Sequence, residues 1–342
     1  MENDLFTLLF FIIFLLIINI VLKKFSISLD SISDGENHKS LLSPDSSTPL
    51  SGTFFFLPII LFLFYQNDII LTIYCILLFL LGLLSDVKIF SSYKLRLITQ
   101  FLILSSLFFI SKEITIDTRI LFLDNLMNYN STRILLCVFF FMVLINGFNL
   151  IDGTNCLCSL NLLIISIFIF LLVHNLNIDY LNYELKILTL SLTIFLLFNF
   201  FGKNFLGDGA AYGLSFLVGY ILVKITIINN SVSPYFVANL LWYPAFENLF
   251  SILRRNFSNK NNYLPDNHHL HQLVFKYLKT KKFINKNFLL SSFVGIIINL
   301  VLLIFFYLGY VYYDHTITQI FLILSGILLY LITYYVLSNK LK

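Results

Sequence analysis

Three aspartates stand at the borders of long apolar runs, where a charged side chain needs a partner because facing lipid is costly. They are Asp86 in "SDVK", Asp152 in "NLIDG" and Asp208 in "FLGDG". Carboxylates from separate helix ends can together bind a divalent cation, and Mg²⁺ completes its coordination with phosphate oxygens. Mn²⁺ prefers the same oxygen ligands. These residues therefore indicate phosphate chemistry supported by Mg²⁺ or Mn²⁺.

Amide, glycine and basic residues accompany the aspartates. Asn146 and Asn149 precede Asp152 at intervals of three, so on a helix the three side chains form one stripe. The glycines on either side of Asp208 would let the backbone approach a phosphate at the start of a helix. A further segment combines a proline, an aspartate, arginines and histidines, namely Arg254, Arg255, Pro265, Asp266, His268, His269 and His271.

Each of these residues also has an ordinary structural explanation. A single Asp at a helix end is most often a cap, and a His in a basic segment is usually solvated. The lysines between 276 and 282 suit the lipid headgroups beside a membrane. These explanations do not account for the joint pattern, in which four polar clusters each contain at least one Asp: 81–97, 146–155, 199–213 and 254–273.

The elements that must position these clusters are membrane helices. Of the 342 residues, 58% are hydrophobic and only 12% are charged, whereas a soluble protein has about 25% charged residues. Repeated apolar runs near the length of a bilayer span predict an all-α polytopic membrane protein, one domain over 1–342, with about eleven transmembrane helices, or ten. We expect them at 4–22, 53–66, 69–84, 95–111, 134–150, 157–174, 185–200, 210–228, 235–253, 288–309 and 317–337.

The distribution of basic residues predicts the sidedness. With the C-terminus inside and the N-terminus outside, 17 of the 22 Lys and Arg residues lie on the inner face, as the positive-inside rule requires. All four polar clusters then fall on that face. The segment 254–287 becomes an inner basic loop that carries the histidines.

In order and spacing, the four clusters resemble the motifs of the bacterial polyprenyl-phosphate N-acetylhexosamine-1-phosphate transferases. These enzymes, of glycosyltransferase family 4, are relatives of phospho-MurNAc-pentapeptide translocase. "SDVK" (85–88) resembles the family's D-D-x-x-K motif, "NGFNLIDG" (146–153) matches N-x-x-N-x-x-D-G, and "NFFGKNFLGD" (199–208) matches N-F…F-x-G-D. The segment from Arg254 to His271 matches R-R…P-D…H-x-H. The resemblance covers roughly residues 80 to 275.

The resemblance implies a reaction. The family transfers a sugar-1-phosphate from a UDP-sugar to polyprenyl phosphate, such as undecaprenyl phosphate, and releases UMP. It further implies a cytoplasmic active site in a bacterial inner membrane, a homodimer as one arrangement, and no nucleic-acid partner. The site residues that it implies are, as catalytic groups, Asp86, Lys88 and Asp152; as the metal ligand, Asp208; and as substrate-binding groups, Asn146, Asn149, Asn155, Asn199, Arg254, Arg255, His269 and His271.

The sequence departs from the family at informative positions. Ser85 replaces the first Asp of the pair and cannot act as a general base at neutral pH, so either Asp86 suffices or activity is impaired. Asn155 replaces a frequent second Asp, which suggests altered specificity. His-Leu-His in place of three consecutive histidines favours initiation of a surface polysaccharide, such as O-antigen, over peptidoglycan synthesis. The segment 34–53 departs too far for any role to be assigned.

Two other functions fit parts of the sequence. A weakly active or inactive homologue that binds lipid carrier or nucleotide would explain Ser85. A membrane transporter would explain charges among apolar helices, but transporters place such charges near the bilayer midplane in repeated halves. Here the charges lie at helix ends and no internal repeat is visible. The sequence does not specify the sugar, because epimers differ by a few hydrogen bonds.

Overall fold

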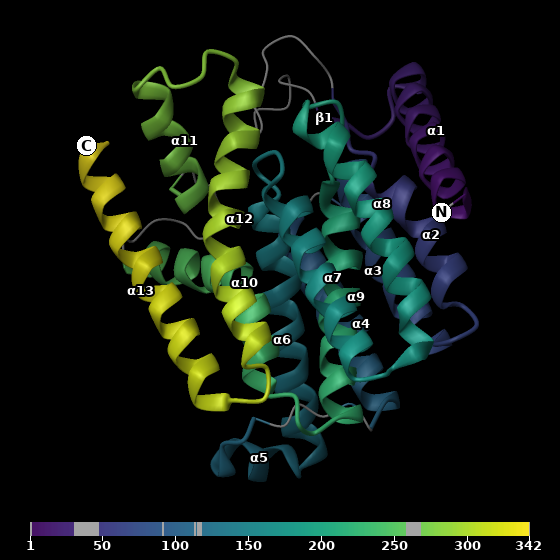
Figure 1. Ribbon diagram of the computed structural model, residues 1–342, viewed down its shortest axis with the longest axis vertical. Helices are drawn as coiled ribbons and strands as arrows, with labels where there is room; N and C mark the ends of the chain where they lie inside the picture. Colours follow the sequence, from purple (N-terminus) through teal and green to yellow (C-terminus); the bar gives the residue numbers. More distant parts are fainter. Residues whose placement is uncertain are drawn as a thin grey trace.

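The computed structural model of the chain is a bundle of α-helices (Figure 1). It describes residues 2–30, 48–90, 92–112, 114, 118–257 and 268–341. The helices of this part are α1 (Glu2–Phe25), α2 (Gly52–Phe64), α3 (Ile69–Asp86), α4 (Tyr93–Ile110), α5 (Leu121–Met127), α6 (Asn130–Ile151), α7 (Leu157–Asn175), the short η2 (Asp179–Leu181), α8 (Asn182–Phe200), α9 (Gly207–Ile228), α10 (Pro234–Phe257), α11 (Leu270–Thr280), α12 (Asn287–Val311) and α13 (Thr316–Lys340).

All eleven predicted helices are present, and their ends lie within four residues of the expected ones. Nine helices in the described ranges are long and apolar enough to cross a membrane. The other two predicted crossings are α2 and α10. The 13 residues of α2 extend only about 20 Å, short of a hydrocarbon core of about 30 Å. α10 has 24 residues, but polar residues such as Asn239, Glu247 and Arg254 interrupt its apolar character.

The segment 254–287 is more ordered than the predicted loop. It starts in the last turn of α10 and contains α11, an 11-residue helix whose buried face includes Leu270, Leu273 and Phe275. Residues 258–267, and with them Pro265 and Asp266, lie outside the described residues.

The centre of the bundle is α9, which Figure 1 shows enclosed by its neighbours, with α1 and α13 at opposite sides. Of its most apolar window, 78% is buried, against 22% for α1, α4 and α13. α3 packs against α9 so closely that a Cβ on Gly82 would collide with the backbone of Gly209. The outer helices instead expose apolar side chains such as Phe6 and Phe321, as expected of surfaces in contact with lipid.

A two-stranded antiparallel sheet pairs β1 (Leu29–Asp30) with β2 (Thr48–Pro49). The chain after β2 also bonds to the connection that precedes α9, because Phe205 N–H donates to Pro49 O at 2.9 Å and Ser51 N–H donates to Phe205 O at 3.1 Å. The described end of the segment 34–53 therefore lies beside the start of α9, while residues 31–47 lie outside the described part.

Candidate functional site

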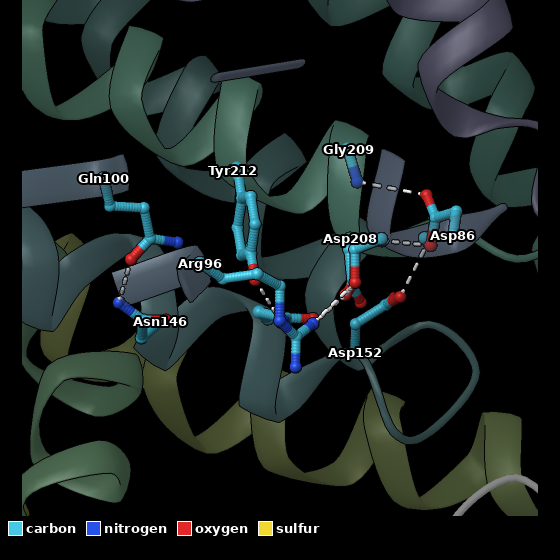
Figure 2. Close-up of polar contacts among 11 residues, drawn as sticks. Asp86, Arg96, Gln100, Asn146, Asp152, Asp208, Gly209 and Tyr212 are labelled. Carbon is cyan, nitrogen blue, oxygen red and sulfur yellow. Dashed lines mark hydrogen bonds and ion pairs between the residues drawn. The ribbon is translucent and has the colours of Figure 1, made fainter. Parts of the chain in front are cut away.

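The start of α9 collects the carboxylates predicted to meet (Figure 2). Asp86, the last residue of α3, accepts from Asp208 N–H at 2.9 Å through Oδ1 and from Gly209 N–H at 3.1 Å through Oδ2. Asp152, at the end of α6, accepts from Gly207 N–H at 3.1 Å through Oδ2. Each carboxylate satisfies amide groups that the first turn of a helix leaves without partners, and each is favoured by the positive end of the helix dipole. The predicted convergence of the three aspartates is present.

The glycines at this helix start allow two parts of the protein to approach. Gly207 has φ +81°, and a Cβ on it would lie 2.7 Å from Asp86 Oδ2. A Cβ on Gly209 would collide with Thr53 Oγ1 and lie 2.9 Å from Phe79 O. The sequence suggested that these glycines admit a phosphate. In the structure they admit carboxylates and the neighbouring helices α2 and α3.

Asp208 is held on one side by a pair of donors. Its Oδ2 accepts from Arg96 Nη1 of α4 at 2.7 Å and from Ser85 Oγ of α3 at 2.7 Å. Arg96 Nη1 also donates to Ser85 Oγ at 2.6 Å. The ion pair is mostly buried, with the Arg96 and Asp208 side chains 23% and 19% exposed. Ser85, which departs from the family, is therefore part of the contact that orients Asp208.

The predicted stripe on α6 reaches two neighbouring helices. Asn149 Nδ2 donates to Tyr212 Oη of α9 at 3.2 Å, one turn beyond Asp208. Asn146 Nδ2 instead donates to Gln100 Oε1 of α4 at 2.8 Å (Figure 2). Asn149 and Asp152 thus face the start of α9, whereas Asn146 lies deeper, between α6 and α4.

The two predicted histidines are buried at the start of α11. Their rings stack with centroids 5.6 Å apart and planes 4° from parallel. A Cβ on Gly153 would lie 3.3 Å from His271 Nε2, so this ring adjoins the turn that follows Asp152. The polar cluster 254–273 therefore lies beside the polar cluster 146–155. His269 Nδ1 lies 3.0 Å from the Glu247 carboxylate of α10.

The other predicted residues surround this centre in different ways. Lys88 is exposed just after α3, with φ +62°. Arg254 donates to the Tyr334 hydroxyl at 2.7 Å and to the His268 carbonyl; Arg255 lies half-buried beside it in the last turn of α10.

Asn155 and Asn199 are buried and bonded within the protein. Asn155 N–H donates to Ser291 Oγ of α12 at 3.0 Å. Asn199 Oδ1 accepts from Cys156 N–H at 2.7 Å, and its Nδ2 donates to Asn204 O at 2.8 Å. These contacts join α8 to the start of α7 and to the connection before α9. Their expected roles in substrate binding stay predictions.

The donor set limits the kind of metal that would fit. Across the described ranges, no group of three or more His, Cys, Asp and Glu side chains is arranged to hold a metal. The second oxygen of Asp208, Oδ1, accepts no hydrogen bond from the described part of the chain, while Oδ2 is engaged by Arg96 and Ser85. One available carboxylate oxygen fits Mg²⁺ or Mn²⁺, which would take its remaining ligands from phosphate and water. It does not fit a closed site made of protein alone.

Sequence reasoning missed two charged residues of this region. Arg96 was counted only as inner-face positive charge, although its spacing four residues before Gln100 puts both on one face of α4. Glu247 was passed over inside a predicted crossing. The signal was present, because a lone acid in "WYPAFENLF" must find a partner in an apolar surrounding.

The site can be compared with known proteins. The profile of glycosyl transferase family 4 matches residues 69–226, from the start of α3 to near the end of α9. The chain is 29% identical over 228 residues to undecaprenyl-phosphate alpha-N-acetylglucosaminyl 1-phosphate transferase of Thermotoga maritima, covering 66% of this chain and 67% of the relative. It is 30% identical over 196 residues to phospho-N-acetylmuramoyl-pentapeptide-transferase of Dictyoglomus thermophilum, covering 54% of this chain and 60% of the relative. With its three aspartates inside the matched region, this multi-pass membrane protein is similar to glycosyl transferase family 4 over residues 69–226.

Proposed function

We propose that this chain transfers a sugar-1-phosphate from a UDP-sugar to polyprenyl phosphate and releases UMP. The observation that carries the proposal is the meeting of Asp86, Asp152 and Asp208 at the start of α9, at one end of a bundle of membrane helices. The match of residues 69–226 to the family model supports it, as do the names of the two relatives, both of which are transferases of phosphorylated sugars.

The reaction joins two anions. An oxygen of the lipid phosphate attacks the phosphorus that carries the sugar, a new P–O bond forms, and the bond to the phosphate of UMP breaks. The attacking phosphate is already ionised, so no side chain has to remove a proton, and Ser85 in place of an Asp does not stop the chemistry. Asp208 would hold Mg²⁺ or Mn²⁺, which offsets the charge of the meeting phosphates.

The protein groups divide between the two substrates. Lys88 and Asp86, at the end of α3, would lie beside the lipid phosphate. Asp152 and Asn149, at the end of α6, would line the diphosphate. The nucleotide phosphates would contact the basic groups at the ends of α10 and α11, namely Arg254, Arg255, His269 and His271. Asn146, Asn155 and Asn199 would act behind this layer, through the helices that they join.

The finer assignments belong to the same proposal. We infer an N-acetylated hexosamine as the sugar, the cytoplasmic face of a bacterial inner membrane as the location, and an outside N-terminus with an inside C-terminus. We also infer that the product initiates a surface polysaccharide such as O-antigen. The support for the last inference is the His-Leu-His sequence. Identities of 29% and 30% to one relative of each kind favour neither polysaccharide initiation nor peptidoglycan synthesis.

A reconstituted assay tests the reaction. Purified protein, polyprenyl phosphate and Mg²⁺ are mixed with single UDP-sugars, and UMP release is measured. We expect release with at least one UDP-N-acetylhexosamine, and release lowered at least about 100-fold by Asp208→Ala. Asp68→Ala is the matched control, because it removes an ion pair of similar length, 2.6 Å to Lys224, at the far ends of α3 and α9.

Two outcomes would count against the proposal. UMP release by Asp208→Ala at close to the wild-type rate would refute the metal role. If no UDP-sugar supports release while UMP still binds, the chain would be a homologue that binds the nucleotide without turnover, the alternative raised by Ser85.

A further inference from the structure

Glu247 is a fully buried acid that the proposed reaction does not use. It lies in α10, is 1% exposed, and accepts three hydrogen bonds. Oε1 lies 3.0 Å from His269 Nδ1 and 3.3 Å from Leu270 N, and Oε2 accepts from Tyr330 Oη of α13 at 2.8 Å. Burying a carboxylate is costly unless its oxygens are satisfied by good partners. These three contacts therefore stabilise the buried Glu247 carboxylate.

These contacts fix the segment that precedes α11. Arg254, two helical turns after Glu247 on α10, donates to the His268 carbonyl. Glu247 binds His269 and Leu270, the two residues that follow His268. In addition, His269 N–H donates to Gln272 Oε1 at 3.1 Å. Two side chains of α10 thus hold the segment from His268 to Leu270. The bond between His269 and Gln272, within the start of α11, holds it further.

The fixed segment places the stacked histidines beside the turn that follows Asp152. A carboxylate only accepts hydrogen bonds, so the proton of His269 lies on Nδ1 and Nε2 is the ring nitrogen directed away from Glu247. The His269 ring is stacked on that of His271, and His271 lies beside Gly153, the residue after Asp152. The order Tyr330, Glu247, His269, His271, Gly153 runs from α13 to the candidate site.

We propose that Glu247 is a positioning residue for the nucleotide, which orients His269 and the stacked His271 against the phosphates of the UDP-sugar. The inference rests on the proposed function, because it needs the histidines to bind that substrate. Glu247 itself touches no substrate. Its effect should therefore fall on nucleotide affinity and leave the lipid substrate and the chemical step almost unchanged.

The test is Glu247→Gln, which keeps the shape and one acceptor oxygen but loses the charge. UMP affinity is measured by its concentration-dependent shift in thermal unfolding, and KM and kcat are measured for both substrates. We expect UMP affinity to fall and KM for the UDP-sugar to rise about tenfold, taking as a guide the lower end of the losses seen when a carboxylate partner of a metal-binding His is removed. KM for polyprenyl phosphate and kcat should change less than about threefold.

Two further variants separate positioning from folding. Glu184→Gln alters a second buried acid, 5% exposed and bonded to Asn67 at the other end of the bundle, and should leave UMP affinity unchanged. Tyr330→Phe removes one of the three bonds to Glu247 and should weaken UMP binding by a smaller factor. If Glu247→Gln and Tyr330→Phe both bind UMP as the wild type does, the inference is overturned. Wild-type protein that binds UMP but transfers no sugar would refute the proposed function alone.

Discussion

Removing the Ser85 hydroxyl tests whether this residue is a passive replacement or part of the site. Ser85→Ala would delete a 2.7 Å bond to Asp208 Oδ2 and a 2.6 Å bond from Arg96 Nη1. A hydrogen bond to a charged group contributes about 1.5–3 kcal/mol. Arg96 still donates to Asp208 at 2.7 Å, so we expect the lower end, about 1.5 kcal/mol. This corresponds to about a tenfold loss in kcat/KM, since 1.36 kcal/mol is a factor of ten.

Ser85→Asp is the companion variant, and its effect depends on the metal. A second carboxylate about 3.5 Å from that of Asp208 would repel it by about 5 kcal/mol at an effective dielectric constant of 20. Arg96 contacts both positions and offsets much of this repulsion. A divalent cation would offset the rest, so half-maximal activity should require less Mg²⁺ than in the wild type.

The assay is UMP release across a Mg²⁺ titration, with thermal unfolding to show that each variant is folded. A Ser85→Ala enzyme within twofold of the wild type would refute the reasoning, because the hydroxyl would then contribute nothing to the orientation of Asp208. A Ser85→Asp enzyme that needs more Mg²⁺ would refute the electrostatic part.

Three shorter predictions address the same region. Asp208→Ala should lower UMP release at least about 100-fold and abolish any Mg²⁺-dependent shift in thermal unfolding. Gly207→Ala should cost about 1–3 kcal/mol of stability, measured by thermal unfolding, because of φ +81° and the close Asp86 carboxylate; Gly202→Ala, at φ +63° with its nearest contact at 3.4 Å, should cost less. Burial raises the pKa of Cys156 to about 12, so the thiol stays protonated at pH 8. It should resist maleimide in the folded protein and react only after denaturation, which mass spectrometry can follow.

The sequence predicted the helices well because an apolar run long enough for a bilayer has few other structures open to it. The sequence did not predict α11, because this segment is not a long apolar run. Lysines and histidines in 268–287 suggested a loop, although Leu270, Leu273 and Leu278 already had helical spacing. A short amphipathic helix depends on tertiary packing, and nothing in a single sequence identifies the helices that cover its apolar face.

The sequence predicted at which depth in the membrane the site residues lie, but not which of them are neighbours. Sidedness placed Asp86, Asp152 and Asp208 at the same end of their helices, and the hydrogen bonds to α9 agree. Sidedness gives depth along the membrane normal but no lateral neighbours. For that reason Arg96 could not be assigned to Asp208, nor Glu247 to His269, before the packing of α4 and α10 was known.

The charges at the start of α9 bear on the metal independently of any resemblance. Asp86, Asp152 and Asp208 bring three negative charges, whereas Arg96 brings one positive charge and a helix N-terminus contributes about half of one. The first turn of α9 already gives its amide groups to the carboxylates of Asp86 and Asp152. Counted alone, these groups at the start of α9 are net negative, and they would repel two incoming phosphates unless cations accompany them. Lys88 is exposed nearby, and a divalent ion held by Asp208 would offset further negative charge. Binding of the UDP-sugar should accordingly weaken when divalent cations are chelated, even without the lipid substrate.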